Sequence, residues 1–178
     1  NMPDFRSGER TFQVLTQVAG RAGRGDVPGE VIVQTFRPQH YALRHAIAQD
    51  YDGFAREELQ YRRELDYPPY SRMLRFRIEA QDSGPAEHFS TQLAMKIRKR
   101  LKSMGGVGCN DSTLEILGPT PGIFDKLQGR HRWQVVIKGS SSQRLNHLVQ
   151  EITQTEYSGF RPPSGVKLGI DVDPIELY

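Results

Sequence analysis

Two consecutive prolines, Pro68 and Pro69, divide this chain of 178 residues into parts with different hydrophobic patterns. Proline cannot continue a helix, and it pushes the residue before it out of the helical region. Before the pair the apolar residues follow helical spacing, whereas after it they alternate as in half-buried strands. The prolines therefore mark the best candidate domain boundary, with a unit of a different class on each side.

The part before the prolines is predicted to be mainly helical. Helices are expected over 8–22, 39–49 and 51–65, the first capped by Ser7. Gly23, Gly25, Pro28 and Gly29 end the first helix, and the apolar Val31-Ile32-Val33 predicts a short strand within 29–35. The first helix has a narrow apolar stripe at helical spacing, formed by Phe12, Leu15, Ala19 and Ala22.

The part after the prolines predicts an α+β domain. Alternating apolar residues indicate strands over 74–80, 113–117, 133–137 and 166–172. A helix from Gly84 to Met104 and another over 143–152 separate them, and a Pro/Gly loop is expected over 118–129. The order β-α-β-β-α-β is the split βαβ arrangement of ferredoxin-like domains, in which the helices cover one face of the sheet.

Composition limits the possible functions. The single cysteine, Cys109, excludes a disulfide framework and a zinc site built from cysteines, and the five histidines have no metal-ligand spacing, so no metal site is predicted. No apolar run is long enough to span a membrane, and no signal-peptide pattern is present, which favours the reducing cytosol. A net charge of +3 permits a polyanionic partner. Because the chain starts at Asn1, we expect it to be a piece of a longer protein.

The stretch from Gln17 to Arg24 carries the strongest chemical signal. On a helical wheel Gln17, Arg21 and Arg24 project from one side, opposite the apolar stripe, with Arg10 on the same polar side. Guanidinium groups match phosphate oxygens in a bidentate way, and Gly20 allows a nucleotide to approach the backbone closely. The pattern therefore favours a polyphosphate ligand. The alternative is an ordinary solvated helix face. A dinucleotide-binding loop is excluded, because these glycines follow a helix and do not open one after a strand.

These residues resemble a known family. Gln17–Arg24 is similar to motif VI of superfamily-two helicases. A narrower resemblance, to the PriA family of replication-restart helicases (primosomal protein N′), extends over essentially the whole chain. It is carried by Pro3–Arg6, Glu9–Gln13, Gln17–Arg24, Gly29–Thr35, Glu64–Tyr70, Leu117–Pro119, Gly129–Gln134 and Asp171–Pro174.

The resemblance implies a bacterial, ATP-dependent 3′–5′ DNA helicase that binds branched forks and restarts replication through primosome assembly. Residues 1–49 would be the C-terminal end of helicase lobe 2, an α/β remnant of a RecA-like lobe. Residues 50–70 would be a bridging helix and Pro-Pro linker, and 71–178 a ferredoxin-like C-terminal domain. The implied partners are branched and single-stranded DNA, single-strand DNA-binding protein and other primosome proteins, with no membrane. The implied location is the cytoplasm, in association with the nucleoid.

The resemblance also implies residue roles. Gln17, Gly20 and Arg21 would face the nucleotide cleft together with Arg24, the arginine finger; Arg10 is a second candidate on geometry alone. The chain has no Gly-x-x-x-x-Gly-Lys-Ser/Thr loop and no cysteine-rich zinc module, so ATP, magnesium and zinc belong to other parts of the longer protein. We expect the chain by itself to bind no cofactor and to hydrolyse no ATP.

Three basic residues near a predicted loop are candidates for DNA binding. Lys126, Arg130 and Arg132 lie beside Gly129, where they could grip phosphates, although an ordinary basic hairpin loop is the alternative. An acidic tail of single-strand DNA-binding protein is implied as a partner, with Arg144 or Asn146 as contacts. The basic run Lys96–Lys102 is expected to be the solvated back of a core helix, with a DNA or acidic-partner role as the alternative.

Two further hypotheses are open. The uncovered sheet face would show a nearly balanced set of charges: Arg75, Arg77, Arg132, Lys138, Lys167, Glu79, Glu115, Asp171 and Asp173. On that face Asp171 and Asp173 are expected to cap a strand end rather than to serve acid-base or metal chemistry.

The rival to the helicase hypothesis is a free-standing ferredoxin-like interaction module without a nucleotide role, which predicts that residues 8–22 fold back onto the C-terminal domain.

Overall fold

The computed structural model describes residues 4–22, 30–103, 114–154 and 160–175. The chain divides into two compact units between Leu65 and Asp66, shortly before the two prolines. The first unit is helical, and the second combines helices with a sheet.

The first unit consists of α1 (Ser7–Ala22), α2 (Tyr41–Ala48) and α3 (Tyr51–Glu64). Its apolar core is small: Phe12, Ala42, Ala46 and Phe54 are buried, with Leu15 and Tyr41 packed against them. The Phe12 and Phe54 rings stack with their centroids 4.2 Å apart, which joins α1 to α3. The predicted helices and the Phe12–Leu15 part of the apolar stripe are therefore confirmed.

Side chains at the helix starts fix where these helices begin. Asp50 accepts a hydrogen bond from the Gly53 amide (2.8 Å) and caps α3, and the His40 ring accepts one from the Ala42 amide and caps α2. Ser7 is the first helical residue of α1 and not its cap. In the turn before it, the Asp4 carboxylate accepts from the Arg6 amide and the Asp4 carbonyl from the Ser7 amide.

The strand predicted within 29–35 is wrong for residues 30–35, which form no regular structure; Gly29 lies outside the described residues. The side chain of Ile32 is 87% exposed, and Val31 and Val33 are exposed as well. A strand needs a neighbour for its backbone N–H and C=O groups. The only sheet in the described part of the chain lies in the second unit, so this apolar segment has none.

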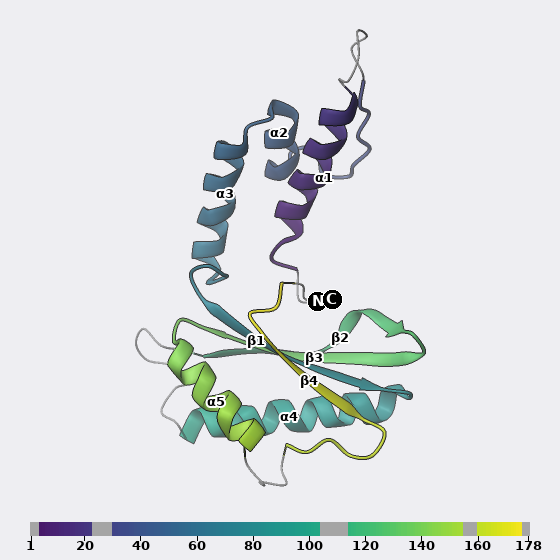
Figure 1. Ribbon diagram of the computed structural model, residues 1–178, viewed down its shortest axis with the longest axis vertical. Helices are drawn as coiled ribbons and strands as arrows, with labels where there is room; N and C mark the ends of the chain where they lie inside the picture. Colours follow the sequence, from purple (N-terminus) through teal and green to yellow (C-terminus); the bar gives the residue numbers. More distant parts are fainter. Residues whose placement is uncertain (1–3, 23–29, 104–113, 155–159, 176–178) are drawn as a thin grey trace. The chain divides into compact units, whose positions relative to one another are not determined.

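The second unit has the predicted order β-α-β-β-α-β. Its strands form one antiparallel sheet in the order β2-β3-β1-β4 (Figure 1). The elements are β1 (Arg72–Ala80), α4 (Ser83–Ser103), β2 (Glu115–Leu127), β3 (Arg130–Gly139), α5 (Ser142–Gln154) and β4 (Lys167–Val172).

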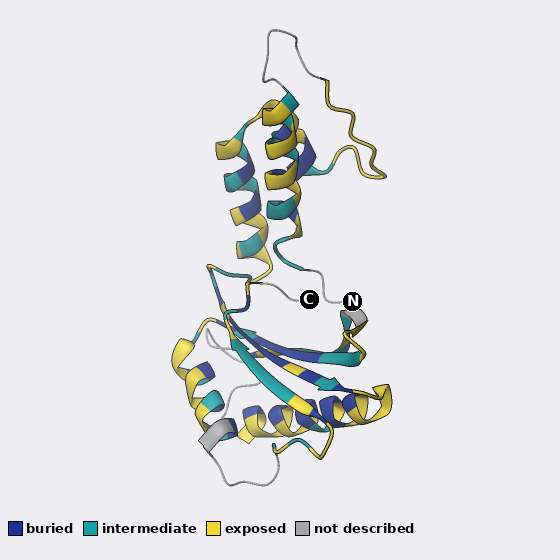
Figure 2. Ribbon diagram, turned by 45° about the vertical axis from the view of Figure 1, so that its right-hand side comes forward, coloured by how far each residue is buried: buried dark blue, intermediate teal, exposed yellow. Residues whose placement is uncertain are grey.

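The main core lies between one face of this sheet and the two helices. Alternation along β1 and β3 places Phe76, Ile78 and Ile137 there with none of their surface exposed. The inner sides of α4 and α5 complete the core, and their outer sides are exposed (Figure 2). The alternating pattern in the sequence therefore predicted this core correctly.

The Pro/Gly loop predicted over 118–129 is wrong for most of its length. Strand β2 continues to Leu127, with irregularities in its register, and places Lys126 on a strand. Only Gln128 and Gly129 form the turn, both with positive φ (51° and 77°). A two-residue turn with that geometry matches the twist of paired strands, so it joins β2 and β3 directly.

The opposite sheet face is less open than the sequence predicted. Met73 and Val136 lie on it and are buried. Tyr67 covers part of it, because its ring centroid lies 5.0 Å from the Lys138 ammonium. The expected charges do lie on this face, and several are joined in ion pairs, such as Arg75 with Asp171 and Lys138 with Glu115.

In the described residues no helix combines the length and the apolar character needed to cross a membrane.

Two glycines of α1 provide a matched test of the helical packing. A Cβ atom added at Gly8 would lie 2.1 Å from the Tyr41 hydroxyl oxygen, whereas one added at Gly20 would meet nothing within 4 Å. We expect Gly8→Ala to destabilise the helical unit by about 1–3 kcal/mol through overpacking. Gly20→Ala should stabilise it by about 0.5–1 kcal/mol by removing glycine from a helix.

Amide hydrogen exchange in α1, α2 and α3 measures both effects without interference from the second unit. Equal protection in the two variants would contradict the close packing at Gly8.

Candidate functional site

The side of α1 that carries the candidate motif faces away from the core of its unit. Gln17, Gly20 and Arg21 are all exposed, whereas Phe12 is buried against α2 and α3. The helical wheel predicted one polar side for Gln17, Arg21 and Arg24, and the structure exposes the first two of these together with Gly20. Arg24 lies outside the described residues.

The two arginines of α1 differ in their surroundings. Arg10 forms an ion pair with Asp4 (Nη1 to Oδ2, 2.9 Å), so its guanidinium is already engaged by a carboxylate. Arg21 forms no ion pair with any residue that the structure describes, and it is exposed. On this comparison Arg21 is the better candidate to meet an external anion.

A polar network around the buried Glu58 joins the N-terminal end of α1 to α2 and α3. Arg62 of α3 donates to Glu9 of α1 (2.9 Å) and to Glu58 of α3 (2.7 Å). The Tyr41 hydroxyl of α2 donates to the other oxygen of Glu58 at 2.5 Å. Glu58 is only 5% exposed, so its charge depends on these partners.

The network shifts the pKa values of its members. Burial raises the pKa of Tyr41 well above its usual range, and the hydrogen bond to Glu58 and its negative charge raise it further. Burial alone would lower the pKa of Arg62, but the hydrogen bonds to Glu9 and Glu58 outweigh it, so the pKa is raised. Both groups therefore keep the protonation state that holds the helices together.

A second polar cluster, centred on His45, joins α2 to α3. His45 places Nδ1 3.2 Å from Asp50 and Nε2 2.9 Å from Glu57, and Arg44 also contacts Glu57 (3.2 Å). The hydrogen bond from the Gly53 amide, followed by the contact with His45, lowers the pKa of Asp50. Because the two carboxylates lie on opposite sides of the imidazole ring, the cluster is a brace between helices and presents no common point for a metal ion.

The predicted DNA-binding residues of the β2–β3 hairpin are split between the two sheet faces. Residues paired across strands share a face, so Lys126 lies with its partner His131, and Arg130 and Arg132 lie on the other side. The Arg132 Nε atom is 3.1 Å from Glu79. The Nη1 atom of Arg130 is buried without a hydrogen-bond partner among the described residues.

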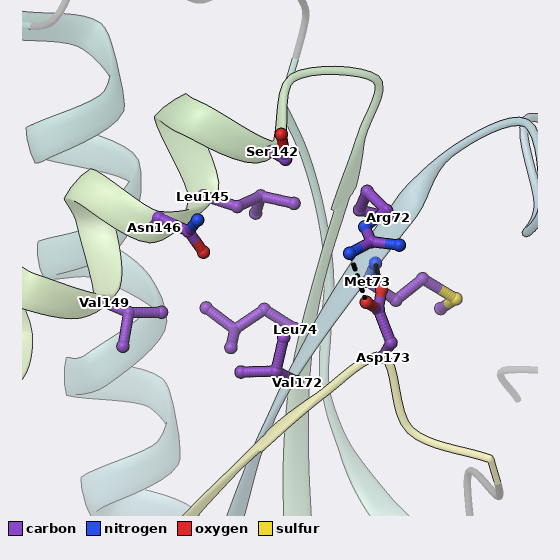
Figure 3. A pocket seen from close by; sticks show the side chains of 9 residues that line it. All are labelled: Arg72, Met73, Leu74, Ser142, Leu145, Asn146, Val149, Val172 and Asp173. Carbon is purple, nitrogen blue, oxygen red and sulfur yellow. Dashed lines mark hydrogen bonds and ion pairs between the residues drawn. The ribbon is translucent and has the colours of Figure 1, made fainter.

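A small pocket lies between α5 and the neighbouring strands β1 and β4 (Figure 3). It is lined largely by apolar side chains, with Asn146 on one side and an ion pair between Arg72 and Asp173 (3.2 Å) on the other. Of the two predicted partner contacts, Asn146 lines this pocket. Arg144 does not line it, and its amide donates to Ser141 (3.3 Å).

The two aspartates at the end of the chain hold the sheet edge. Asp173 accepts a hydrogen bond from the Met73 amide (3.1 Å) and donates its own amide to the Met73 carbonyl (2.7 Å). Asp171, expected to cap a strand end, instead lies within β4 and pairs with Arg75 (2.7 Å). Within the described residues no group of three or more His, Cys, Asp or Glu side chains is placed to hold a metal ion.

Comparison with known proteins decides the family. The model of the primosomal protein N C-terminal domain matches residues 63–175. The chain belongs to this PriA family. Its match covers the whole β-α-β-β-α-β unit, so the resemblance seen in the sequence is confirmed.

Relatives in the PriA family match the helical unit as well. The chain is 37% identical over 177 residues to a "Replication restart protein PriA" of Synechocystis, and 37% identical over 174 residues to those of Bacillus subtilis and Haemophilus influenzae. These matches cover 98–99% of the chain but only 20–22% of the relatives. The chain therefore spans about a fifth of the length of these PriA proteins.

The network around Glu58 was not predicted from the sequence of this PriA-family chain. The spacing of Glu58 and Arg62, four residues apart on a helix, is a visible signal for an ion pair. Tyr41 and Glu9 reach the network from other helices, at separations of 17 and 53 residues from their partners. No periodicity within a single helix could have identified them.

The raised pKa of Tyr41 predicts a loss of stability at high pH. The folded unit favours the protonated hydroxyl, so its stabilising effect is complete below the ordinary tyrosine pKa of 10.0 and declines as the pH rises above it. Tyr41→Phe should cost about 1–2 kcal/mol at neutral pH and remove this part of the pH dependence.

Tyr51→Phe is the control, because Tyr51 is 67% exposed. Stability measured by amide exchange of the helical unit from pH 8 to 11 compares the two variants. If Tyr41→Phe and Tyr51→Phe gave the same profile as the unmodified chain, the network would have no energetic role.

Proposed function

We propose that this chain is the C-terminal part of an ATP-dependent 3′–5′ DNA helicase that binds branched forks and restarts replication by primosome assembly. The observation that carries the proposal is the outward side of α1, where Gln17, Gly20 and Arg21 are exposed on a helix whose other side is fixed to α2 and α3. A helicase needs such arginines at the edge of its nucleotide cleft.

Exposed apolar residues support a RecA-like lobe that continues beyond this chain. Val14 and Val18 are 58% and 44% exposed on α1, and the apolar segment from Val31 to Val33 has no strand partner in the described residues. In an α/β lobe, helices cover both faces of a parallel sheet, so helices and strands of this kind are buried there. Helix α1 packs within the helical unit, against α2 and α3, which supports its place in a helicase lobe rather than in a free-standing ferredoxin-like module.

The residues present fit only half of a nucleotide site. Arg21, with Arg24 by position, would contact the phosphates, and Arg24 would stabilise the charge that develops during transfer of the terminal phosphoryl group. The lysine loop and the magnesium ligands would come from another part of the longer protein. Zinc would belong to a separate module, since the chain has one cysteine. By itself the chain would therefore hydrolyse no ATP.

The second unit would contribute DNA and partner binding. Its strand order, with β3 and β1 central, supports a ferredoxin-like topology. The three basic side chains of the hairpin, Lys126, Arg130 and Arg132, would contact phosphates. The pocket beside Asn146 would accept the acidic tail of single-strand DNA-binding protein, with Arg144 nearby on α5. The site of action would be the cytoplasm, at the nucleoid.

Substitution of the motif arginines tests the proposal in the longer protein that contains this chain. Arg21→Ala and Arg24→Ala should each lower kcat for DNA-stimulated ATP hydrolysis, by about 1,000-fold for the finger, because the transition-state charge loses its partner. Arg37→Ala is the matched control, since Arg37 is an exposed arginine of the same unit outside the motif. Turnover equal to that of the unmodified protein in both motif variants would contradict the proposal.

A further inference from the structure

The C-terminal half of α4 carries the densest exposed positive charge in the described chain. Five of the seven residues from Lys96 to Lys102 are lysine or arginine, and all five are exposed. The other side of the same helix buries Leu93, Ile97 and Leu101 against the sheet (Figure 2). At helical spacing Lys99 and Lys102 lie opposite the core-facing stripe, and Lys96 and Arg98 flank them on either side.

Among the described residues, few ion pairs join this charge to a carboxylate. The sequence has no Asp or Glu from His88 to Ser103. Arg100 pairs with Glu151 of α5, and the Arg98 guanidinium donates to the Gly118 carbonyl of β2. Lys99 and Lys102 form no ion pair with any described residue. We name Lys96, Arg98, Lys99 and Lys102 the α4 basic face.

Helix electrostatics explain only part of this arrangement. Cations near a helix C-terminus are favoured by the helix dipole, but that effect is confined to about the last turn. In α4, which ends at Ser103, Lys102 lies within that turn, whereas Lys96 and Lys99 precede it. The dipole therefore does not account for positive charges at Lys96 and Lys99. A helix face that is only solvated could equally well carry charges of both signs.

The composition of the face favours a phosphate backbone over an acidic protein. Protein interfaces are built around buried aromatic or apolar anchors and are depleted in lysine. Met95 is the one large apolar side chain exposed on α4, and no aromatic accompanies it. Six residues of helical rise separate Lys96 from Lys102, about 9 Å, a length over which duplex DNA presents several phosphates.

The α4 basic face and the β2–β3 hairpin lie at opposite ends of the sheet. Ala80 at the end of β1 pairs with His131 beside the hairpin turn. Helix α4 starts three residues later, at Ser83, and runs back along the sheet, so its C-terminal half lies far from the turn (Figure 1). Substitutions at one site can therefore be separated from effects at the other.

We propose that the α4 basic face is a contact surface for the phosphate backbone of DNA, separate from the hairpin. This inference rests on the proposed DNA-binding function of the second unit, and it names a surface of that unit that contacts the DNA. Phosphate contacts made by lysine are independent of sequence, so the face would hold a duplex arm of any sequence and supply most of the salt dependence of binding.

Removal of two ammonium groups tests the inference. The 178-residue chain and its Lys99→Gln/Lys102→Gln variant are titrated against a labelled forked duplex at several salt concentrations, with fluorescence anisotropy as the readout. The expected result is weaker binding and a salt slope smaller in magnitude by about 1.8, or about 0.9 for each lost phosphate contact. Glutamine preserves the helix, and far-UV circular dichroism verifies it.

The control is Arg161→Gln/Lys167→Gln, which removes the same net charge from exposed positions of the same unit. An equal loss in both double variants would overturn the inference, because it would reflect net charge and not a surface. Unchanged binding in the Lys99/Lys102 variant, with a loss on Arg130→Gln, would overturn it and leave the proposed function intact.

Two more outcomes test the proposed DNA-binding function itself and the alternative that the face binds an acidic protein. Failure of the unmodified chain to bind the fork at low salt would overturn the proposed DNA-binding function itself. If polyglutamate binds the unmodified chain, and the Lys99/Lys102 variant loses polyglutamate but retains DNA, the face recognises an acidic protein and the inference is overturned.

Discussion

The structure of the helical unit depends on one buried carboxylate. Glu58 is buried, and its charge is tolerated because Arg62 and the Tyr41 hydroxyl both bind it. Arg62 extends the network to Glu9 at the start of α1. The apolar core of this unit is small, so the polar network specifies which way α1 lies on its neighbours.

That arrangement gives α1 two sides with different roles. Phe12 and the network hold one side, and the opposite side presents Gln17, Gly20 and Arg21 to the surroundings. Exposed valines on α1 and the apolar segment at Ile32 mark where further structure would pack in a longer protein. In the proposed function, this outward side of α1 would complete a site whose other half another lobe contributes.

The second unit was the more predictable part of the chain. Alternation in β1 and β3 and helical spacing in α4 identified its core because each pattern is local. The segment at Ile32 has the composition of a strand but has no neighbouring strand among the residues that the structure describes. The hairpin residues were expected in one loop, yet the pleat puts Lys126 and Arg130 on different faces. The Tyr41–Glu58 contact joins two helices and leaves no periodic trace in the sequence.

Native-state amide exchange of the Arg62→Met variant tests most directly whether the network fixes α1. Breaking a buried ion pair costs about 3 kcal/mol or more, so the α1 amides should lose at least about 100-fold in protection, while those of β1 and β3 keep theirs. Unchanged protection in α1 would contradict the account, because α1 would then be held by its apolar contacts alone.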